Sequence, residues 1–153
     1  MPVHVGSAAP FTLIAVWAYK KVGASTEDTY IGQVYQALMD HPEWFNGNPA
    51  VVAGDFNSNK IWDAEREVGN HSGVVKFLDE HGLVSAYHQN LNEPQGTETC
   101  PTFHLFRHKE RPYHLDYVFI PREWIVRLRA VEVGGYEQWS KLSDHCPVVV
   151  DMC

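Results

Sequence analysis

The sequence predicts an α/β fold in which sheets and amphipathic helices pack in layers around one core. Apolar and β-branched runs at residues 11–19 and 50–53 are typical of buried strands. Apolar residues at helical spacing follow each run, over residues 25–41 and 71–81. Residues 114–120 then alternate between the two sides of a further strand. Strands that alternate with helices along the chain indicate the layered α/β class.

The length and composition describe an ordinary globular chain. With 153 residues it is long enough for a real core, so we expect a single domain over residues 1–153. The net charge is −7, whereas a dedicated DNA-binding module usually has an excess of Lys and Arg. Three scattered cysteines argue against a disulfide framework and predict a reducing, cytoplasmic location. We recognise no signal peptide and no apolar run long enough to span a membrane.

The first strand and the first helix follow from local pattern. Residues 11–19 (FTLIAVWAY) are continuously apolar, and an aromatic such as Trp17 or Tyr19 is expected in the core more often than at a surface. Ser25 or Thr26 can cap the helix over residues 25–41. The residues expected on its buried stripe are Ile31, Val34, Tyr35, Leu38 and Met39.

The central stretch is Ala50 to Asn59 (AVVAGDFNSN), where a buried strand ends in a glycine and two polar side chains. If the extended run persists, Asp55 and Asn57 lie on the same side of the strand. A carboxylate beside an amide suits a hard metal ion and a phosphate oxygen. The alternative is a simple Asx-turn that closes the strand. This stretch alone leaves the two interpretations even.

The next elements are a loop over residues 60–70 and an amphipathic helix over 71–81, which Gly82 ends. A short strand over residues 83–87 follows. Residues 89–111 are polar and are expected to form a long surface loop that contains a strand at 102–106. This region contains one cysteine and three histidines that could bind zinc, namely Cys100, His104, His108 and His114. We do not favour a zinc site, because the closely spaced ligand pairs of structural zinc sites are missing.

The last third of the chain places a carboxylate inside a strand. Asp116 shares a face with Val118 and Ile120, and a buried carboxylate is costly unless it is paired. His145 is the partner that the sequence offers. Further strands are expected within residues 124–133 and 148–150, and the second of these should pack on the core.

Three motifs together resemble the endonuclease/exonuclease/phosphatase superfamily, which is similar to DNase I. They are Gly54-Asp55-Phe56-Asn57, Leu115-Asp116-Tyr117 and Ser143-Asp144-His145-Cys146-Pro147. Each motif is weak alone, but their order and spacing make the match specific. The resemblance implies a two-layer β-sandwich flanked by helices. It also implies metal-dependent hydrolysis of phosphoesters by a nuclease, phosphatase or phosphodiesterase, with water attacking phosphorus in line.

The resemblance implies a role for each motif residue. Asp55 and Asn57 act near the nucleophile and the phosphate, and Asp116 pairs with the catalytic His145. Asp144, with Asp55, is the expected ligand of Mg²⁺, and Mn²⁺ is the alternative ion. Substrate contacts are expected from Asn57, His114 and Trp17. Trp17 is included because relatives carry, near this position, a His or Tyr that touches the phosphate.

The sequence departs from the family pattern at its start. Relatives begin with strands that carry an early Asn and a metal-binding Glu, for which we find no counterpart before Phe11. We therefore expect the C-terminal portion of such a domain, without its N-terminal strands. An uncovered apolar face would then favour self-association through an exposed sheet edge. The alternative function is a truncated, non-catalytic binding or interaction domain derived from the same fold.

Overall fold

A computed structural model describes residues 2–6, 9–20, 30–63 and 69–153. Its main element is a five-stranded sheet in the order β1-β2-β3-β7-β4. Strands β2 and β3 are parallel, and the other neighbours are antiparallel. The strands are β1 (Pro2–Val5), β2 (Phe11–Trp17), β3 (Ala50–Asp55), β7 (Asp116–Pro121) and β4 (Leu83–Ser85).

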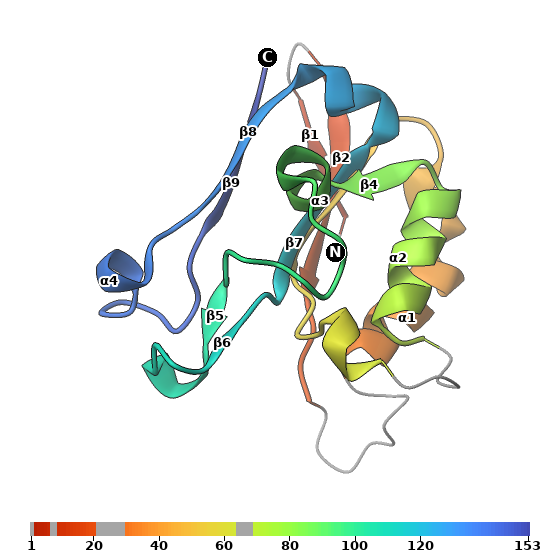
Figure 1. The fold of residues 1–153 in the computed structure, drawn as a ribbon. Coiled ribbons are helices and arrows are strands. Elements are labelled where there is room, and N and C mark those ends of the chain that lie inside the picture. The colour runs from red at the N-terminus through yellow and green to blue at the C-terminus, as the bar shows by residue number, and fades with distance from the viewer. Residues whose placement is uncertain (1, 7–8, 21–29, 64–68) are drawn as a thin grey trace.

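Two helices cover one face of this sheet, α1 (Ile31–Asp40) and α2 (His71–Glu80) (Figure 1). Their buried side chains meet the sheet in one apolar cluster, which drives their packing because it removes apolar area from water. The members of this cluster include Ile14, Val34, Leu38, Val52, Val74, Leu78 and Phe119. The first helix was expected over residues 25–41, but α1 begins at Ile31, after its N-cap residue Tyr30. The cap candidates Ser25 and Thr26 lie outside the described residues.

A second sheet lies on the opposite side of the five-stranded sheet (Figure 1). Its antiparallel strands are β8 (Leu128–Val133) and β9 (Val148–Met152). Ile120 of β7 and Val131 of β8 are buried in a second cluster, with Val150 of β9 packed against it. The molecule is therefore a two-layer β-sandwich with helices on its outer face, as predicted.

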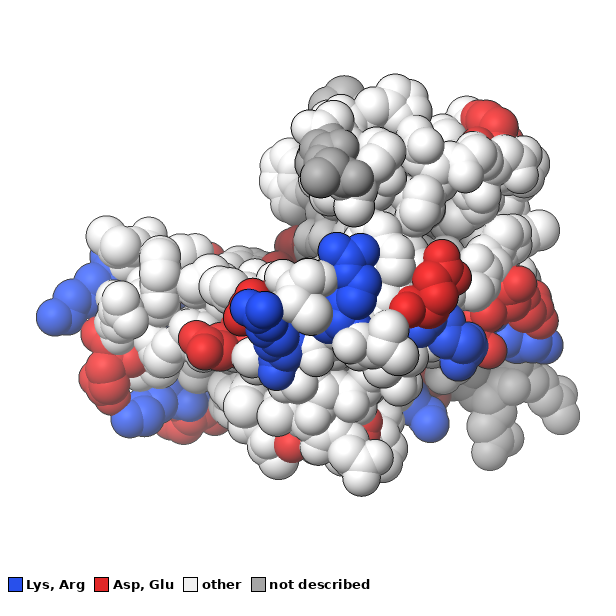
Figure 2. All heavy atoms as spheres, turned by 90° about the horizontal axis from the view of Figure 1, so that it is seen from above, with Lys and Arg blue, Asp and Glu red and all other residues white. Residues whose placement is uncertain are grey.

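The remaining elements are short and connect or flank the sheets. They are η2 (Pro42–Phe45), η3 (Lys60–Trp62), α3 (Ala86–Leu91), β5 (Phe103–His104), η4 (Leu105–Arg107), β6 (Pro112–Tyr113), η5 (Arg122–Arg127) and α4 (Tyr136–Trp139). None of the described helices has both the length and the apolar character needed to cross a lipid bilayer. Seen from above, Lys and Arg side chains alternate with Asp and Glu (Figure 2), so this face has no continuous basic surface.

Two further expectations about the elements were wrong. The strand expected over residues 83–87 ends at Ser85, because Ser85 is the extended N-cap residue of α3 and the chain turns into a helix there. The helix α3 itself was not predicted. Met39 was assigned to the buried stripe of α1 and is 49% exposed.

Candidate active site

The two sheet-borne carboxylates of the motifs lie side by side. Asp55 at the end of β3 is the cross-strand partner of Asp116 at the start of β7, so both side chains point to the same face. Nδ1 of His145 is 2.9 Å from Oδ2 of Asp116, which confirms the predicted pairing. Within the described residues, Asp55, Asp116 and His145 form a group whose potential ligand atoms all lie within 4.8 Å of one another.

The sequence before Asp55 is dictated by the close approach of two strands. Gly54 has φ +138°, and a Cβ built on it would lie 2.0 Å from the carbonyl oxygen of Val16 in β2. Only glycine fits this conformation and this contact without displacing backbone. Beyond Asp55 the side chain of Phe56 is 1% exposed, and its ring contacts Tyr117 with centroids 5.5 Å apart. The turn that carries the site is thus anchored in the core.

The extended run ends at Asp55 and does not continue through Asn57. Oδ1 of Asp55 accepts a hydrogen bond from the backbone N–H of Asn57 at 2.8 Å, and Asn57 has φ +46°. This is the Asx-turn of the alternative interpretation. The Asn57 amide donates to the carbonyl oxygen of Ala18 at 3.3 Å. The turn and the site are therefore compatible, because the turn uses one oxygen of Asp55 and keeps the side chain at the edge of the sheet.

His145 is held in place from several sides. Its backbone N–H donates to Oγ of Ser143 at 3.0 Å, and its ring packs against Phe103 with centroids 4.7 Å apart. The following residue, Cys146, donates its N–H to the carbonyl oxygen of Thr102 at 2.7 Å. These contacts fix the imidazole beside Asp116.

The surroundings of the group raise the pKa of its acid Asp55 and also the pKa of its base His145. Burial, helped by the nearby negative charges of Asp116 and Asp144, raises the pKa of Asp55 in spite of the Asn57 N–H and of His145. The hydrogen bond to Asp116 raises the pKa of His145, and burial opposes this only in part. A charged imidazolium beside carboxylates is the form that can donate to an anionic phosphate.

The donor set fits a hard divalent cation. Carboxylate oxygens are the ligands that Mg²⁺ prefers, and Mg²⁺ usually keeps several waters, so one or two protein carboxylates suffice. Among the described residues, Asp55 has no hydrogen bond to a histidine, whereas Asp116 is engaged by His145. The predicted ligand Asp144 is not in the group of three, although its charge acts on Asp55 and His145.

A hollow of about 470 Å³ opens from this group into the space between the two sheets. Asp116 and His145 line one part of it, together with Gly54. Its other walls are mostly apolar and come from both sheets and from α4, namely Leu13, Ala53, Val118, Trp139 and Val148. The site is therefore reached from an apolar groove as well as from solvent.

The other predicted contact residues lie in different surroundings. Trp17 was expected in the core more often than not, and this is wrong: it is 78% exposed, next to Asp55 across the β2–β3 pair. His114 is only 4% exposed, and its Nδ1 bonds the carbonyl oxygen of Cys100 at 2.7 Å. Its ring lies 4.4 Å from that of Tyr87, so burial does not favour the predicted substrate contact by His114.

Thr102 is a supporting residue that the sequence did not single out. It is 0% exposed, and its Oγ1 accepts the backbone N–H groups of Leu115 at 2.9 Å and of Asp116 at 3.0 Å. It therefore joins the segments that carry Asp116 and His145. The signal for it is absent from the sequence, because a lone threonine in a polar loop resembles any turn residue.

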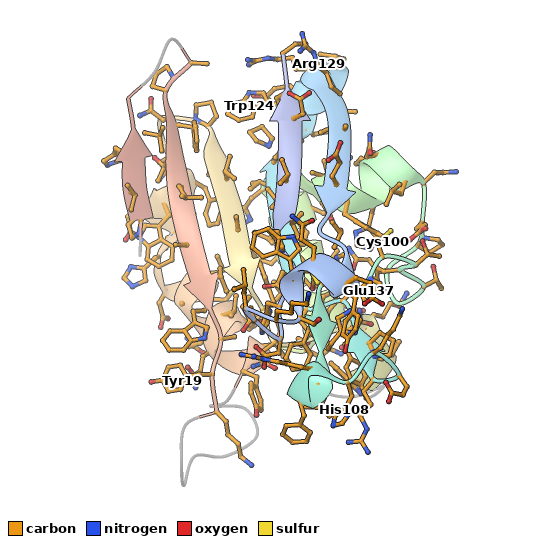
Figure 3. All side chains as sticks on the ribbon, turned by 90° about the vertical axis from the view of Figure 1, so that its left-hand side faces the viewer. Tyr19, Cys100, His108, Trp124, Arg129 and Glu137 are labelled. Atoms are coloured by element: carbon orange, nitrogen blue, oxygen red, sulfur yellow. The ribbon has the colours of Figure 1, made fainter. Side chains whose placement is uncertain are left out.

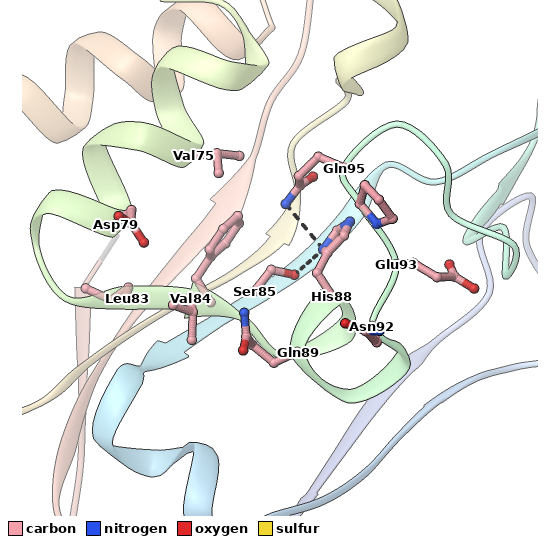
Figure 4. Close-up of a pocket in the computed structure, with 12 residues that line it drawn as sticks. Val75, Asp79, Leu83, Val84, Ser85, His88, Gln89, Asn92, Glu93 and Gln95 are labelled. Carbon is pink, nitrogen blue, oxygen red and sulfur yellow. Dashed lines mark hydrogen bonds between the residues drawn. The ribbon is translucent and has the colours of Figure 1, made fainter.

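A buried polar network lies behind the site. The side chain of Glu98 is 3% exposed and accepts from Nε2 of His88 at 3.0 Å, from the N–H of Gly96 at 2.9 Å and from the amide of Asn59 at 3.1 Å. Figure 4 shows the far side of this network, where His88 contacts Ser85 at 2.7 Å and Gln95 at 3.2 Å in a pocket of about 390 Å³. The network ties the loop after β3 to α3.

The β-sandwich fold of this chain is DNase I-like, and solved structures of nucleases and phosphatases share it. The 3′ phosphatase NExo from Neisseria, bound to a product DNA hairpin, matches with TM-score 0.70 and 18% identity over 99% of this chain and 64% of its own. An AP endonuclease from Archaeoglobus fulgidus matches with TM-score 0.66 and 19% identity over 99% of this chain and 64% of its own.

The endonuclease domain of the retrotransposon TRAS1 matches in the same way, with TM-score 0.61 and 19% identity over 99% of this chain and 60% of its own. The chain thus spans less than two thirds of the length of these neighbours. No protein-family model and no curated protein matches its sequence. The resemblance expected from the three motifs is confirmed at the level of the fold.

Proposed function

We propose that this protein hydrolyses phosphoester bonds with the help of a divalent cation, at a site formed by Asp55, Asn57, Asp116, Asp144 and His145. The observation that carries the proposal is the 2.9 Å contact between His145 and Asp116 in one group with Asp55. Neighbours with this fold are nucleases and phosphatases by name. They support hydrolysis over the alternative of a non-catalytic binding domain.

The proposed roles follow from charge and hydrogen-bonding capacity. Asp55 orients the attacking water and accepts its proton. His145, kept charged by Asp116, donates a hydrogen bond to a phosphoryl oxygen. The Asn57 amide is the second donor. Mg²⁺ or Mn²⁺, held by Asp55 and Asp144, would neutralise the phosphate and stabilise the leaving oxygen.

For the substrate we propose a nucleic-acid phosphoester, which the DNA hairpin product bound to NExo supports. The net charge of −7 disfavours extended contacts with a long duplex, because duplex affinity depends on neutralisation of phosphates by Lys and Arg. A chain end or a short segment is the better fit. The exposed indole of Trp17 would form one wall beside the bound phosphate. Three free thiols support the cytoplasm as the compartment.

The test is hydrolysis of a chromogenic phosphodiester by the 153-residue chain with Mg²⁺, with Mn²⁺ and with a chelator. We expect metal-dependent turnover that falls by roughly 100-fold to 10,000-fold in His145→Ala and in Asp55→Ala. His108→Ala is the matched control, since the side chain of His108 is 58% exposed in the loop region. Activity retained in both site variants would overturn the assignment, and turnover in the chelator would overturn the role of the metal.

A further inference from the structure

Aromatic rings lead away from His145 along one face of the β5–β6 hairpin. Phe103 in β5 is the bridge partner of His145 on one side and the cross-strand partner of Tyr113 in β6 on the other. Cross-strand partners share a face, so the three rings lie in one line across neighbouring strand segments. The centroid of the Phe103 ring lies 4.7 Å from that of His145 and 6.5 Å from that of Tyr113. A substrate that reaches His145 therefore reaches Phe103 as well.

Trp62 extends this line by one ring. It is the last residue of η3, and its ring centroid lies 5.2 Å from that of Tyr113. Trp62 is 51% exposed, and Phe103 and Tyr113 are each partly exposed. We call Phe103, Tyr113 and Trp62 the aromatic row. It presents flat apolar surface in direct continuation of the candidate active site.

Contacts on both sides of the hairpin hold the aromatic row in place. The backbone N–H of Thr102 donates to the carbonyl oxygen of Tyr113 at 3.0 Å, and the carbonyl oxygen of Thr102 accepts the N–H of Cys146 at 2.7 Å. Figure 3 shows the hairpin beside α4, which carries Glu137, and Lys109 of the hairpin pairs with Glu137 at 2.6 Å. The aromatic row is therefore fixed by the same segments that position the histidine of the site.

Two cations and a small hollow flank the aromatic row. Lys60 in η3 and Arg111 before β6 are exposed, in the segments that carry Trp62 and Tyr113. A hollow of about 210 Å³ opens beside Tyr113. It is smaller than the pockets of about 300–1,000 Å³ that hold whole ligands, so it suits a single ring system. Flat rings, a small hollow and nearby cations match the bases and phosphates of a nucleic-acid strand.

From these observations we infer that the aromatic row is a stacking platform for unpaired bases next to the phosphate held at His145, so that the substrate is a single strand or an unpaired chain end. The inference rests on the proposed function, since that function places the phosphate at His145. Aromatic side chains stack on any base, because every base has a π-face. In a duplex the neighbouring base pairs cover these faces, so a paired strand cannot use the aromatic row.

The charge of the chain agrees with such a substrate and supplies a signature. With a net charge of −7, the chain gains little from the neutralisation of phosphates on which duplex affinity depends. Stacking needs no such neutralisation, so it persists when salt screens the charges. The contribution of Trp62 to binding should therefore remain when sodium chloride is raised, whereas that of Lys60 should fall.

The experiment is fluorescence anisotropy of a labelled oligothymidine with the 153-residue chain in a chelator, so that binding is measured without hydrolysis. We expect the single strand to bind more tightly than a duplex of the same length. Trp62→Ala and Tyr113→Ala should each weaken single-strand binding by roughly 5-fold to 150-fold. Tyr113→Phe keeps the ring and should bind as the parent does. Phe106→Ala, at a position 73% exposed in the same hairpin, is the matched control and should have no effect.

The outcomes separate this inference from the proposed function. Equal or tighter binding of the duplex overturns the inference. So does single-strand binding that is unchanged in Trp62→Ala and Tyr113→Ala, or that falls equally in Phe106→Ala. Hydrolysis without single-strand binding would overturn the inference alone. Single-strand binding that follows the predicted variant series, without hydrolysis when Mg²⁺ or Mn²⁺ is supplied, would overturn the proposed function alone.

Discussion

At the scale of single residues, the site is governed by the contact between His145 and Asp116. The hydrogen bond raises the pKa of His145 above its ordinary value of 6.5. Because the folded value is the higher one, this pair contributes stability that is fully present below pH 6.5 and is lost as the pH rises through the folded pKa. The same shift keeps the imidazolium available to a phosphate over a wider pH range.

Asp116→Asn tests this coupling. The substitution removes the negative charge and the strong acceptor, so the pKa of His145 should fall and the alkaline limb of hydrolysis should move to lower pH. An NMR titration of the His145 ring measures the pKa directly, and the pH–rate profile measures the limb. Asp151→Asn, on β9, is the control. An unchanged His145 titration would contradict the role given to Asp116.

At the scale of elements, the site depends on how closely β2 and β3 approach each other. Strand β3 delivers Asp55 at its end, and the carbonyl oxygen of Asp55 accepts the N–H of Ala18 at 2.8 Å. Gly54 allows this approach because it has no side chain at a point where the Val16 carbonyl occupies the space. The motif glycine is therefore required by backbone geometry rather than by chemistry at the phosphate.

Gly54→Ala should destabilise the protein strongly. The positive φ alone costs about 1–3 kcal/mol for a residue with a Cβ, and the contact with backbone atoms of β2 adds to this cost. Urea unfolding followed by circular dichroism measures the loss. Gly135→Ala is the matched control, because nothing lies within 4 Å of a Cβ built there. Equal stability of the two variants would show that β2 and β3 can separate freely.

At the scale of the whole molecule, a buried carboxylate holds together segments that are far apart in sequence. Glu98 bonds Asn59 after β3, His88 in α3 and the N–H of Gly96 in its own loop. Burial, the largest single influence, would raise its pKa, but the hydrogen bonds from His88, Gly96 and Asn59 outweigh it and lower the pKa to about 2. The ionised form of Glu98 is therefore part of the folded structure.

Glu98→Gln should lower the free energy of unfolding by roughly 1–3 kcal/mol at neutral pH, since buried donors lose a charged acceptor. Because the folded pKa of Glu98 is depressed, its contribution is present above the ordinary value of 4.5 and is lost as the pH falls toward about 2. The difference between variant and parent should shrink accordingly in acid. Unfolding curves at neutral and acidic pH check this, with the exposed Glu137→Gln as control. A difference that persists in acid would contradict the charge argument.

The alternation of apolar residues was enough to predict most of the fold. The strands β2, β3, β7, β8 and β9 and the helix α2 lie where the pattern placed them, within a few residues at their ends, whereas α1 begins at Ile31 rather than near Ser25. The pairing of Asp116 with His145 was also predictable, because a carboxylate on a strand that buries its other residues needs a partner, and the chain offered one. The three motifs predicted the DNase I-like fold on the same residues.

Only the tertiary structure decided the rest, because it depends on contacts between segments distant in sequence. Contacts with segments distant in sequence decide three features that local pattern did not. These are the Asx-turn at Asp55, the exposure of Trp17 and the helix start after Ser85. The same holds for Thr102 and Glu98, whose polar side chains resemble ordinary loop residues until their buried partners are in place. Local pattern therefore determined most of the elements and the motif residues, and packing determined the turn at Asp55 and the partners of the buried polar side chains.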